Sequence, residues 1–86
     1  MKLYEVLAKI DNPEDMQALF EDLCTYREIE QMEQRIECVQ HFFNNETYSD
    51  ISKKTEASSA TLSRVSRCIQ RGSGGYSRVL RNILND

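Results

Sequence analysis

Apolar side chains recur at helical spacing along almost the whole chain, and no segment shows the strict alternation that is typical of a β-strand. The first group predicts a short opening helix and consists of Leu3, Val6, Leu7 and Ile10. A second helix is expected to start at Pro13, because Asn12 suits the N-cap position and acidic residues follow the proline. The apolar face of this second helix consists of Met16, Leu19, Phe20 and Leu23.

A long third helix is predicted from the sequence of a capping box, in which Thr25 and Glu28 satisfy each other's backbone donors. Its apolar positions alternate in spacing between 3 and 4 residues and are Ile29, Met32, Ile36, Val39 and Phe43. This heptad-like seam suits packing along another helix. Two interpretations stay open: the seam binds a helix of another chain, or it packs against the core of its own chain.

Residues 47–71 predict two short helices joined by a tight turn. The first is expected from about Tyr48 to Thr55 with Thr47 as its cap, and the second from about Ser59 to Arg71 with Ser58 as its cap. A glycine-rich run ends the second helix, and a terminal helix follows with an apolar face of Tyr76, Val79, Leu80 and Ile83. The sequence therefore predicts an all-α fold with a single domain over residues 1–86.

The second helix of this pair is expected to have two chemically different faces. At about 100° per residue, one narrow apolar stripe contains Leu62, Val65 and Ile69. The opposite side carries small residues and hydroxyls at its start and arginines in its later turns, namely Ser59, Ala60, Ser63, Arg64, Arg67 and Arg71. Small side chains permit close approach to the major groove, and arginine can bind guanine or phosphate with two hydrogen bonds.

Charge is divided unevenly along the chain, whose formal net charge is −3. Residues 1–46 carry 4 basic and 11 acidic side chains, a net charge of −7, whereas residues 47–86 carry 7 basic and 3 acidic ones, a net charge of +4. Such asymmetry points to nucleic-acid contact. Lys53 and Lys54 are expected to meet the DNA backbone beside the groove. The alternatives are a solvated arginine face and lysines that complement the dipole of their helix.

Together these features predict a helix-turn-helix that binds double-stranded DNA. Two other functions stay open: a helical adaptor whose acidic N-terminal half binds a basic protein, and RNA binding through the same basic helices. An enzyme is not expected, because no nucleophile–base pair, phosphate-binding loop or metal-ligand cluster is visible and His41 is the only histidine.

The cysteines and the absence of apolar runs predict a reduced, cytoplasmic protein. Cys24, Cys38 and Cys68 are scattered, with no CxxC pair, and each is expected to be a small, reduced core residue. No signal peptide or membrane span is visible, and no metal or cofactor is expected.

Two strings of residues carry a resemblance to a known family. Ser58–Cys68 reads SSATLSRVSRC, and Gly72–Tyr76 reads GSGGY. From about Leu23 to Leu84 the chain resembles the Trp-repressor-like proteins, most of all their YerC/YecD-type branch, whose members carry a similar SxATxSRVxRC helix followed by GSGGY. The resemblance implies an intertwined homodimer with the long helix in the dimer core. It also implies a transcriptional repressor whose two helix-turn-helix units read successive major grooves of a near-palindromic site.

The residues expected to contact DNA come from both helices of the pair and their caps. They are Thr47, Tyr48, Ser49, Lys53, Lys54, Ser58, Ser59, Ala60, Ser63, Arg64, Arg67 and Arg71.

The resemblance also implies where an effector would bind. Arg35, Arg64 and Thr25 match pocket residues of the tryptophan-binding members, and Cys68 replaces a pocket serine. Val65 stands where those members have a glycine, so its isopropyl group is expected to obstruct an indole. Tryptophan is therefore not the expected corepressor, and any other effector is open. The two arginines either hold a different ligand or pair with carboxylates and phosphate.

One further departure concerns the turn. Glu56 stands where the turn of the family commonly has glycine, which predicts strain if the backbone there is left-handed.

Overall fold

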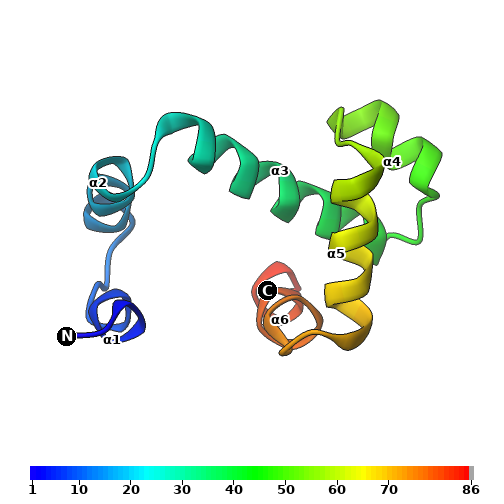
Figure 1. Cartoon of the computed structure of the whole chain (residues 1–86). Coiled ribbons are helices and arrows are strands. Elements are labelled where there is room, and N and C mark those ends of the chain that lie inside the picture. Colours follow the sequence, from blue (N-terminus) through cyan, green and yellow to red (C-terminus); the bar gives the residue numbers. More distant parts are fainter. Residues whose placement is uncertain (86) are drawn as a thin grey trace. The chain divides into compact units, whose positions relative to one another are not determined.

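The computed structural model describes residues 1–85, and all of its regular elements are helices (Figure 1). In chain order these are α1 Leu3–Ala8, α2 Pro13–Leu23, α3 Tyr26–Phe43, α4 Tyr48–Thr55, α5 Ser59–Arg71, the π-helix η1 Gly75–Leu80 and α6 Arg81–Leu84. The chain divides into two compact units, an N-terminal unit Met1–Gln31 and a C-terminal unit that begins at Met32. The all-α prediction is confirmed, whereas the extent of the domain stays a prediction.

In the N-terminal unit, side chains cap α2 and the start of α3 but not α1, and few side chains are covered. Asn12 Oδ1 accepts a hydrogen bond from the Asp15 amide at 2.8 Å and so caps α2. At the start of α3, Glu28 N donates to Thr25 Oγ1 at 3.1 Å and Thr25 N donates to Glu28 Oε1 at 2.8 Å, which confirms the capping box. These bonds from Thr25 lower the pKa of the Glu28 carboxyl. No residue of α1 or α2 is buried, and Leu23 remains 55% exposed.

The core of the C-terminal unit lies between α3, α4 and α5. Its buried apolar residues are Cys38, Val39, Ile51, Ala57, Leu62 and Val65. Phe42, Phe43, Ile69, Tyr76 and Leu80 pack against this core and are partly buried. Burial raises the pKa of the Cys38 thiol.

The three cysteines are free thiols, as expected, but only Cys38 is a core residue. Cys24 and Cys68 are half-buried, so the prediction that each cysteine fills a core position is wrong for these two.

The apolar seam of α3 is covered only in part. Val39 is buried, whereas Ile36 is 43% exposed, and the other three seam residues are half-buried. Cys38, one residue off the seam, is fully buried because α4 packs there through Ile51 and Thr55. The core of the unit therefore accounts for the C-terminal part of the seam and leaves its middle uncovered.

The terminal segment departs from the sequence prediction of one regular helix. Its first part, η1, follows Gly74 at φ +90° and is a π-helix, in which hydrogen bonds span five residues rather than four. That change of period shifts side chains around the axis. Tyr76 and Leu80 pack on the core, whereas Val79 and Ile83 are 43% and 61% exposed, so the core covers only part of the predicted apolar face.

No helix in the part of the chain that the structure describes is both long enough and apolar enough to cross a membrane.

Candidate nucleic-acid interface

Helices α4 and α5 form the helix-turn-helix, and their bounds match the predicted ones (Figure 1). Each begins with a side-chain cap: Thr47 Oγ1 accepts from the Asp50 amide at 3.2 Å, and Ser58 Oγ accepts from the Thr61 amide at 3.1 Å. Such caps are each worth about 1 kcal/mol. The beginning of α5, the end expected to enter the groove, is therefore fixed by a local signal.

The turn between the two helices is tight and left-handed. Glu56 ends α4 at φ +61° and ψ +15°, so the strained geometry expected for a non-glycine residue is present. Its amide donates to the Ser52 carbonyl at 2.9 Å, and Ser52 Oγ donates to the Ala57 carbonyl at 3.3 Å. Ala57 is buried and anchors the turn on the core.

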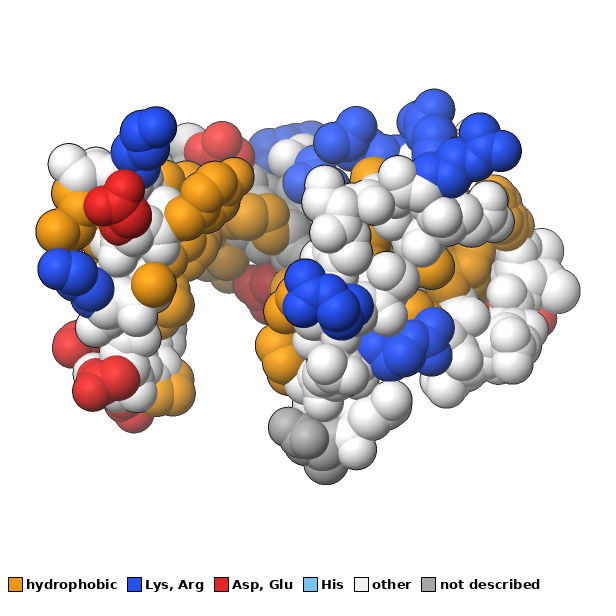
Figure 2. All heavy atoms as spheres, turned by 90° about the horizontal axis from the view of Figure 1, so that it is seen from below, with side chains coloured by type: hydrophobic (Ala, Val, Ile, Leu, Met, Phe, Trp, Pro, Cys, Tyr) orange, Lys and Arg blue, Asp and Glu red, His pale blue; other side chains and the backbone are white. Residues whose placement is uncertain are grey.

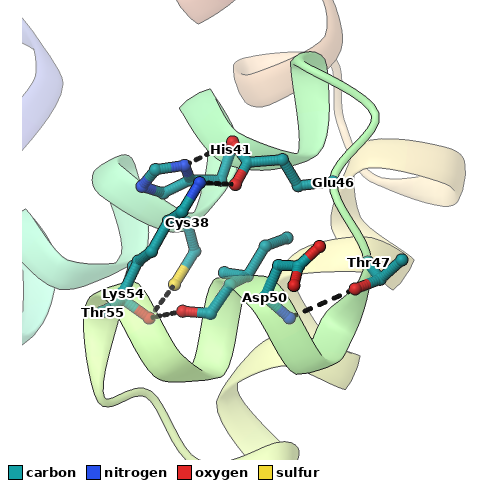
Figure 3. Close-up of polar contacts among 8 residues, drawn as sticks. Cys38, His41, Glu46, Thr47, Asp50, Lys54 and Thr55 are labelled. Carbon is teal, nitrogen blue, oxygen red and sulfur yellow. Dashed lines mark hydrogen bonds and ion pairs between the residues drawn. The ribbon is translucent and has the colours of Figure 1, made fainter.

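Thr55 is buried and joins α3, α4 and the turn through a set of hydrogen bonds, and Figure 3 shows its contact with Cys38 of α3. Its hydroxyl donates to the Ile51 carbonyl at 2.7 Å and accepts from the Ala57 amide at 3.2 Å. The thiol of Cys38 lies 3.7 Å from the same oxygen, and Gln34 Nε2 donates to the Thr55 carbonyl at 3.1 Å. A hydroxyl has one donor and two acceptor sites, so Thr55 uses its full capacity. This residue fixes how α4 and the turn sit on α3.

Helix α5 separates its apolar and polar faces as predicted. Leu62 and Val65 are 2% and 1% exposed, and Ile69 is half-buried. The opposite face is exposed at every predicted position, from Ser59, Ala60 and Ser63 to Arg64, Arg67 and Arg71. Among residues 1–85 none of these three arginines forms an ion pair. Figure 2 shows basic side chains gathered over the C-terminal unit, where few acidic side chains are visible.

The predicted contact residues of α4 have different surroundings from one another. Ser49 and Lys53 are exposed. The ring of Tyr48 is 46% exposed and meets Phe42 edge to face, with 5.3 Å between ring centroids. Lys54 differs from its neighbour Lys53, because its ammonium is held by a carboxylate of the same chain.

That carboxylate is Glu46, which binds two cationic or polar groups at once (Figure 3). Lys54 Nζ lies 2.6 Å from Glu46 Oε1, and His41 Nδ1 lies 2.7 Å from Glu46 Oε2. The hydrogen bond from Lys54, followed by that from His41, lowers the pKa of Glu46, and the same carboxylate raises the pKa of Lys54. This group was not predictable from the sequence, since Glu46 lies 5 residues after His41 and 8 residues before Lys54, across the end of α3.

The residues expected to form an effector pocket have different surroundings, and the pocket itself stays a prediction. Arg35 is half-buried, Arg64 is exposed, and Val65 is buried in the core. Cys68 lines a pocket of about 240 Å³, but the other lining residues are Gly72, Ser73, Gly75 and Tyr76. Thr25 belongs to the N-terminal unit, where it caps α3. The C-terminal unit thus brings neither Arg35 nor Arg64 to the pocket beside Cys68.

Residues 1–84 match the family model described as Trp repressor protein. The chain belongs to this family. It is 34% identical over 82 residues to a Bacillus subtilis (strain 168) protein described as uncharacterized protein YerC, a match that covers 95% of this chain and 79% of the relative. This relationship confirms the resemblance to the YerC-type branch and extends it over the α1 and α2 region.

Two crystal structures have the same fold. One is described as a "putative Trp repressor" from Staphylococcus aureus, with a TM-score of 0.88 and 32% identity over 98% of this chain and 84% of that one. The other is a TrpR-like protein from Eubacterium eligens ATCC 27750, with a TM-score of 0.86 and 37% identity over 94% of this chain and 84% of that one. The Trp-repressor-like fold of this chain is therefore established.

Proposed function

We propose that this protein is a sequence-specific DNA-binding transcriptional regulator of the repressor type, which acts as a homodimer. The observation that carries the proposal is the exposed face of α5. Arg64, Arg67 and Arg71 project from a capped helix whose other face is locked into the core, and no intramolecular carboxylate neutralises them among residues 1–85. A fixed helix with unpaired arginines suits the major groove.

Side-chain size and charge determine which residues of the interface contact bases and which contact phosphates. Ser59, Ala60 and Ser63, near the beginning of α5, approach base edges, and the arginines bind guanine or phosphate. The phosphates beside the groove are met by the polar residues at the start of α4 and α5 and at the end of α4, which are Thr47, Tyr48, Ser49, Ser58, Lys53 and Lys54.

Dimerisation is supported by apolar side chains that the single chain leaves exposed. Leu23 and Ile36 are 55% and 43% exposed, and no residue of α1 or α2 is buried. A second copy that covers them would give each chain the apolar burial that so small a chain needs. A twofold dimer would place two copies of α5 about one helical turn of DNA apart, roughly 34–36 Å, and so select a near-palindromic site.

Tryptophan is excluded as corepressor in this proposal, because Val65 fills the position that must be empty for an indole. Its side chain is 1% exposed and belongs to the core cluster, so rotation cannot clear the space without loss of packing. The chain is proposed to act without catalysis or a cofactor, in the cytoplasm where it would meet chromosomal DNA.

Replacement of Arg67 tests the proposal. We expect Arg67→Ala to weaken binding to sheared genomic DNA by roughly 5- to 150-fold, since a specific arginine contact is worth about 1–3 kcal/mol. The matched control is Gln70→Ala, an exposed neutral position on the same helix, which should leave affinity unchanged. Circular dichroism and size-exclusion chromatography should be the same for both variants.

Two outcomes would contradict the proposal. Retention on DNA that is indifferent to salt and to Arg67→Ala would favour an adaptor that binds protein. Stronger retention on structured RNA than on duplex DNA, lost in Arg67→Ala, would favour RNA recognition.

A further inference from the structure

Lys53 and Lys54 are adjacent in sequence but differ in their surroundings. Successive helical residues point about 100° apart, so one lysine can face the body of the protein while the other faces away. Lys54 Nζ lies 2.6 Å from Glu46 Oε1, whereas Lys53 forms no ion pair among the residues 1–85. The two lysines therefore do not offer equal charge to DNA.

Glu46 is held in place by the backbone before it and by the cap after it. The end of α3 closes through Asn45, which has φ +60° and donates its amide to the Phe42 carbonyl at 3.0 Å. The amide of Glu46 itself donates to the His41 carbonyl at 3.3 Å, and the next residue, Thr47, caps α4. The carboxylate is thus preorganised, and its side chain is only 18% exposed.

His41 completes the arrangement by occupying the second oxygen of the carboxylate. Its Nδ1 lies 2.7 Å from Glu46 Oε2, so Glu46 has one oxygen for each partner and is oriented by both (Figure 3). The lowered pKa of Glu46 and the raised pKa of Lys54 mean that both groups stay charged at neutral pH. The side chain of Lys54 is 56% exposed and its ammonium has donors to spare, but the Glu46 carboxylate beside it compensates its charge, so a DNA phosphate gains less from Lys54 than from the unpaired Lys53.

We infer that Glu46 is a positioning residue that keeps Lys54 away from DNA phosphates, so that Lys54 joins the end of α4 to the end of α3 and Lys53 alone makes the phosphate contact there. This inference rests on the proposed DNA-binding function and corrects one of its contacts. The number of phosphate contacts can be measured, because each phosphate neutralised by a protein cation changes the slope of log K against log salt by about 0.9.

The test is the salt dependence of binding to a fluorescein-labelled duplex of mixed sequence, measured by anisotropy for four variants. A mixed sequence suffices because the counterion term is independent of sequence. Lys53→Gln should reduce the magnitude of the slope by about 0.9, and Lys54→Gln should leave it unchanged. Glu46→Gln should increase it by about 0.9, because the freed ammonium then reaches a phosphate.

The double variant Glu46→Gln with Lys54→Gln should return the slope to the wild-type value. A purely structural role for Glu46 would lower affinity at all salt concentrations without changing the slope, so the slope separates the two roles. Circular dichroism shows whether each variant is folded, and Lys54→Gln decides the question even if Glu46→Gln does not fold. An equal loss of slope in Lys53→Gln and Lys54→Gln would overturn the inference.

If the protein does not bind DNA at all, the same experiment gives a different result from the one that would overturn the role of Glu46. In that case the wild-type protein itself would show no salt-dependent binding, and Lys53→Gln would match it. If the wild type binds with a salt slope and Lys54→Gln reduces that slope, DNA binding stands and only the role given to Glu46 is wrong.

Discussion

Replacement of Glu56 by glycine should stabilise the protein. Glu56 holds φ +61° and ψ +15° at the end of α4, a left-handed conformation in which an L side chain crowds the following carbonyl. Its amide donates to the Ser52 carbonyl, a bond that glycine keeps, and the side chain itself is exposed and makes no hydrogen bond or ion pair among residues 1–85. The substitution therefore removes strain without removing a contact.

The size of the effect follows from two opposed terms. A left-handed L residue costs about 1–2 kcal/mol relative to glycine. Glycine loses more backbone freedom on folding, which costs about 0.5–1 kcal/mol. The net stabilisation expected for Glu56→Gly is thus about 0.5–1 kcal/mol, or several degrees in Tm for a chain of this size, since about 1 kcal/mol shifts Tm by roughly 4–8 °C.

Urea denaturation at one fixed protein concentration measures this difference, and concentration must be matched because a dimer gains stability by mass action. Glu56→Ala is the control: it removes the carboxylate but keeps the left-handed strain, so its stability should be close to that of wild type. Asn45→Gly, at φ +60°, should gain less, because asparagine tolerates this conformation. A Glu56→Gly protein no more stable than Glu56→Ala would refute the argument from strain.

Three further predictions concern buried and charged groups. Thr55→Val keeps the shape of the side chain but leaves the buried Ala57 amide without its acceptor. We therefore expect urea denaturation to show a free energy of unfolding lower by about 1–3 kcal/mol. An unchanged free energy of unfolding would mean that water replaces the lost acceptor. The stability difference between wild type and Glu46→Gln should depend on pH. The pKa of Glu46 is lowered from 4.5 and that of Lys54 is raised from 10.5, so the stability difference should be largest between pH 4.5 and pH 10.5. It should decrease at lower pH as Glu46 is protonated, and at higher pH as Lys54 is deprotonated. A stability difference that does not change with pH would contradict the ion pair. Isothermal calorimetry with tryptophan should give no saturable heat, whereas micromolar binding would refute the argument from Val65.

Local signals in the sequence were sufficient for the parts of the fold that depend on them. The bounds of α4 and α5 were predictable because Thr47 and Ser58 cap them. The left-handed turn at Glu56 was predictable only through the family resemblance, which identified where glycine is usual. The exposed arginine face of α5 followed from helical periodicity, since Leu62 and Val65 fix the opposite side.

Features that depend on contacts between elements were not predictable. The π-helical period of η1 has no signature in the spacing of Tyr76, Val79, Leu80 and Ile83, which suits an α-helix equally well. The hydrogen bonds of Thr55 require that α3 and the turn meet at one point, which no local pattern encodes. The same holds for Lys54, which looks like a free cation until the α3–α4 connection places Glu46 beside it.

Selection of bound fragments from a random pool of duplex DNA, followed by sequencing, tests the central claim most directly. If two copies of α5 read successive major grooves, the selected fragments should share a near-palindromic motif with half-sites about 10–10.5 base pairs apart, centre to centre. Wild type should enrich this motif and Gln70→Ala should enrich it equally, whereas Arg67→Ala should not. A pool that shows no enrichment over its starting composition with wild-type protein would contradict sequence-specific recognition by α5.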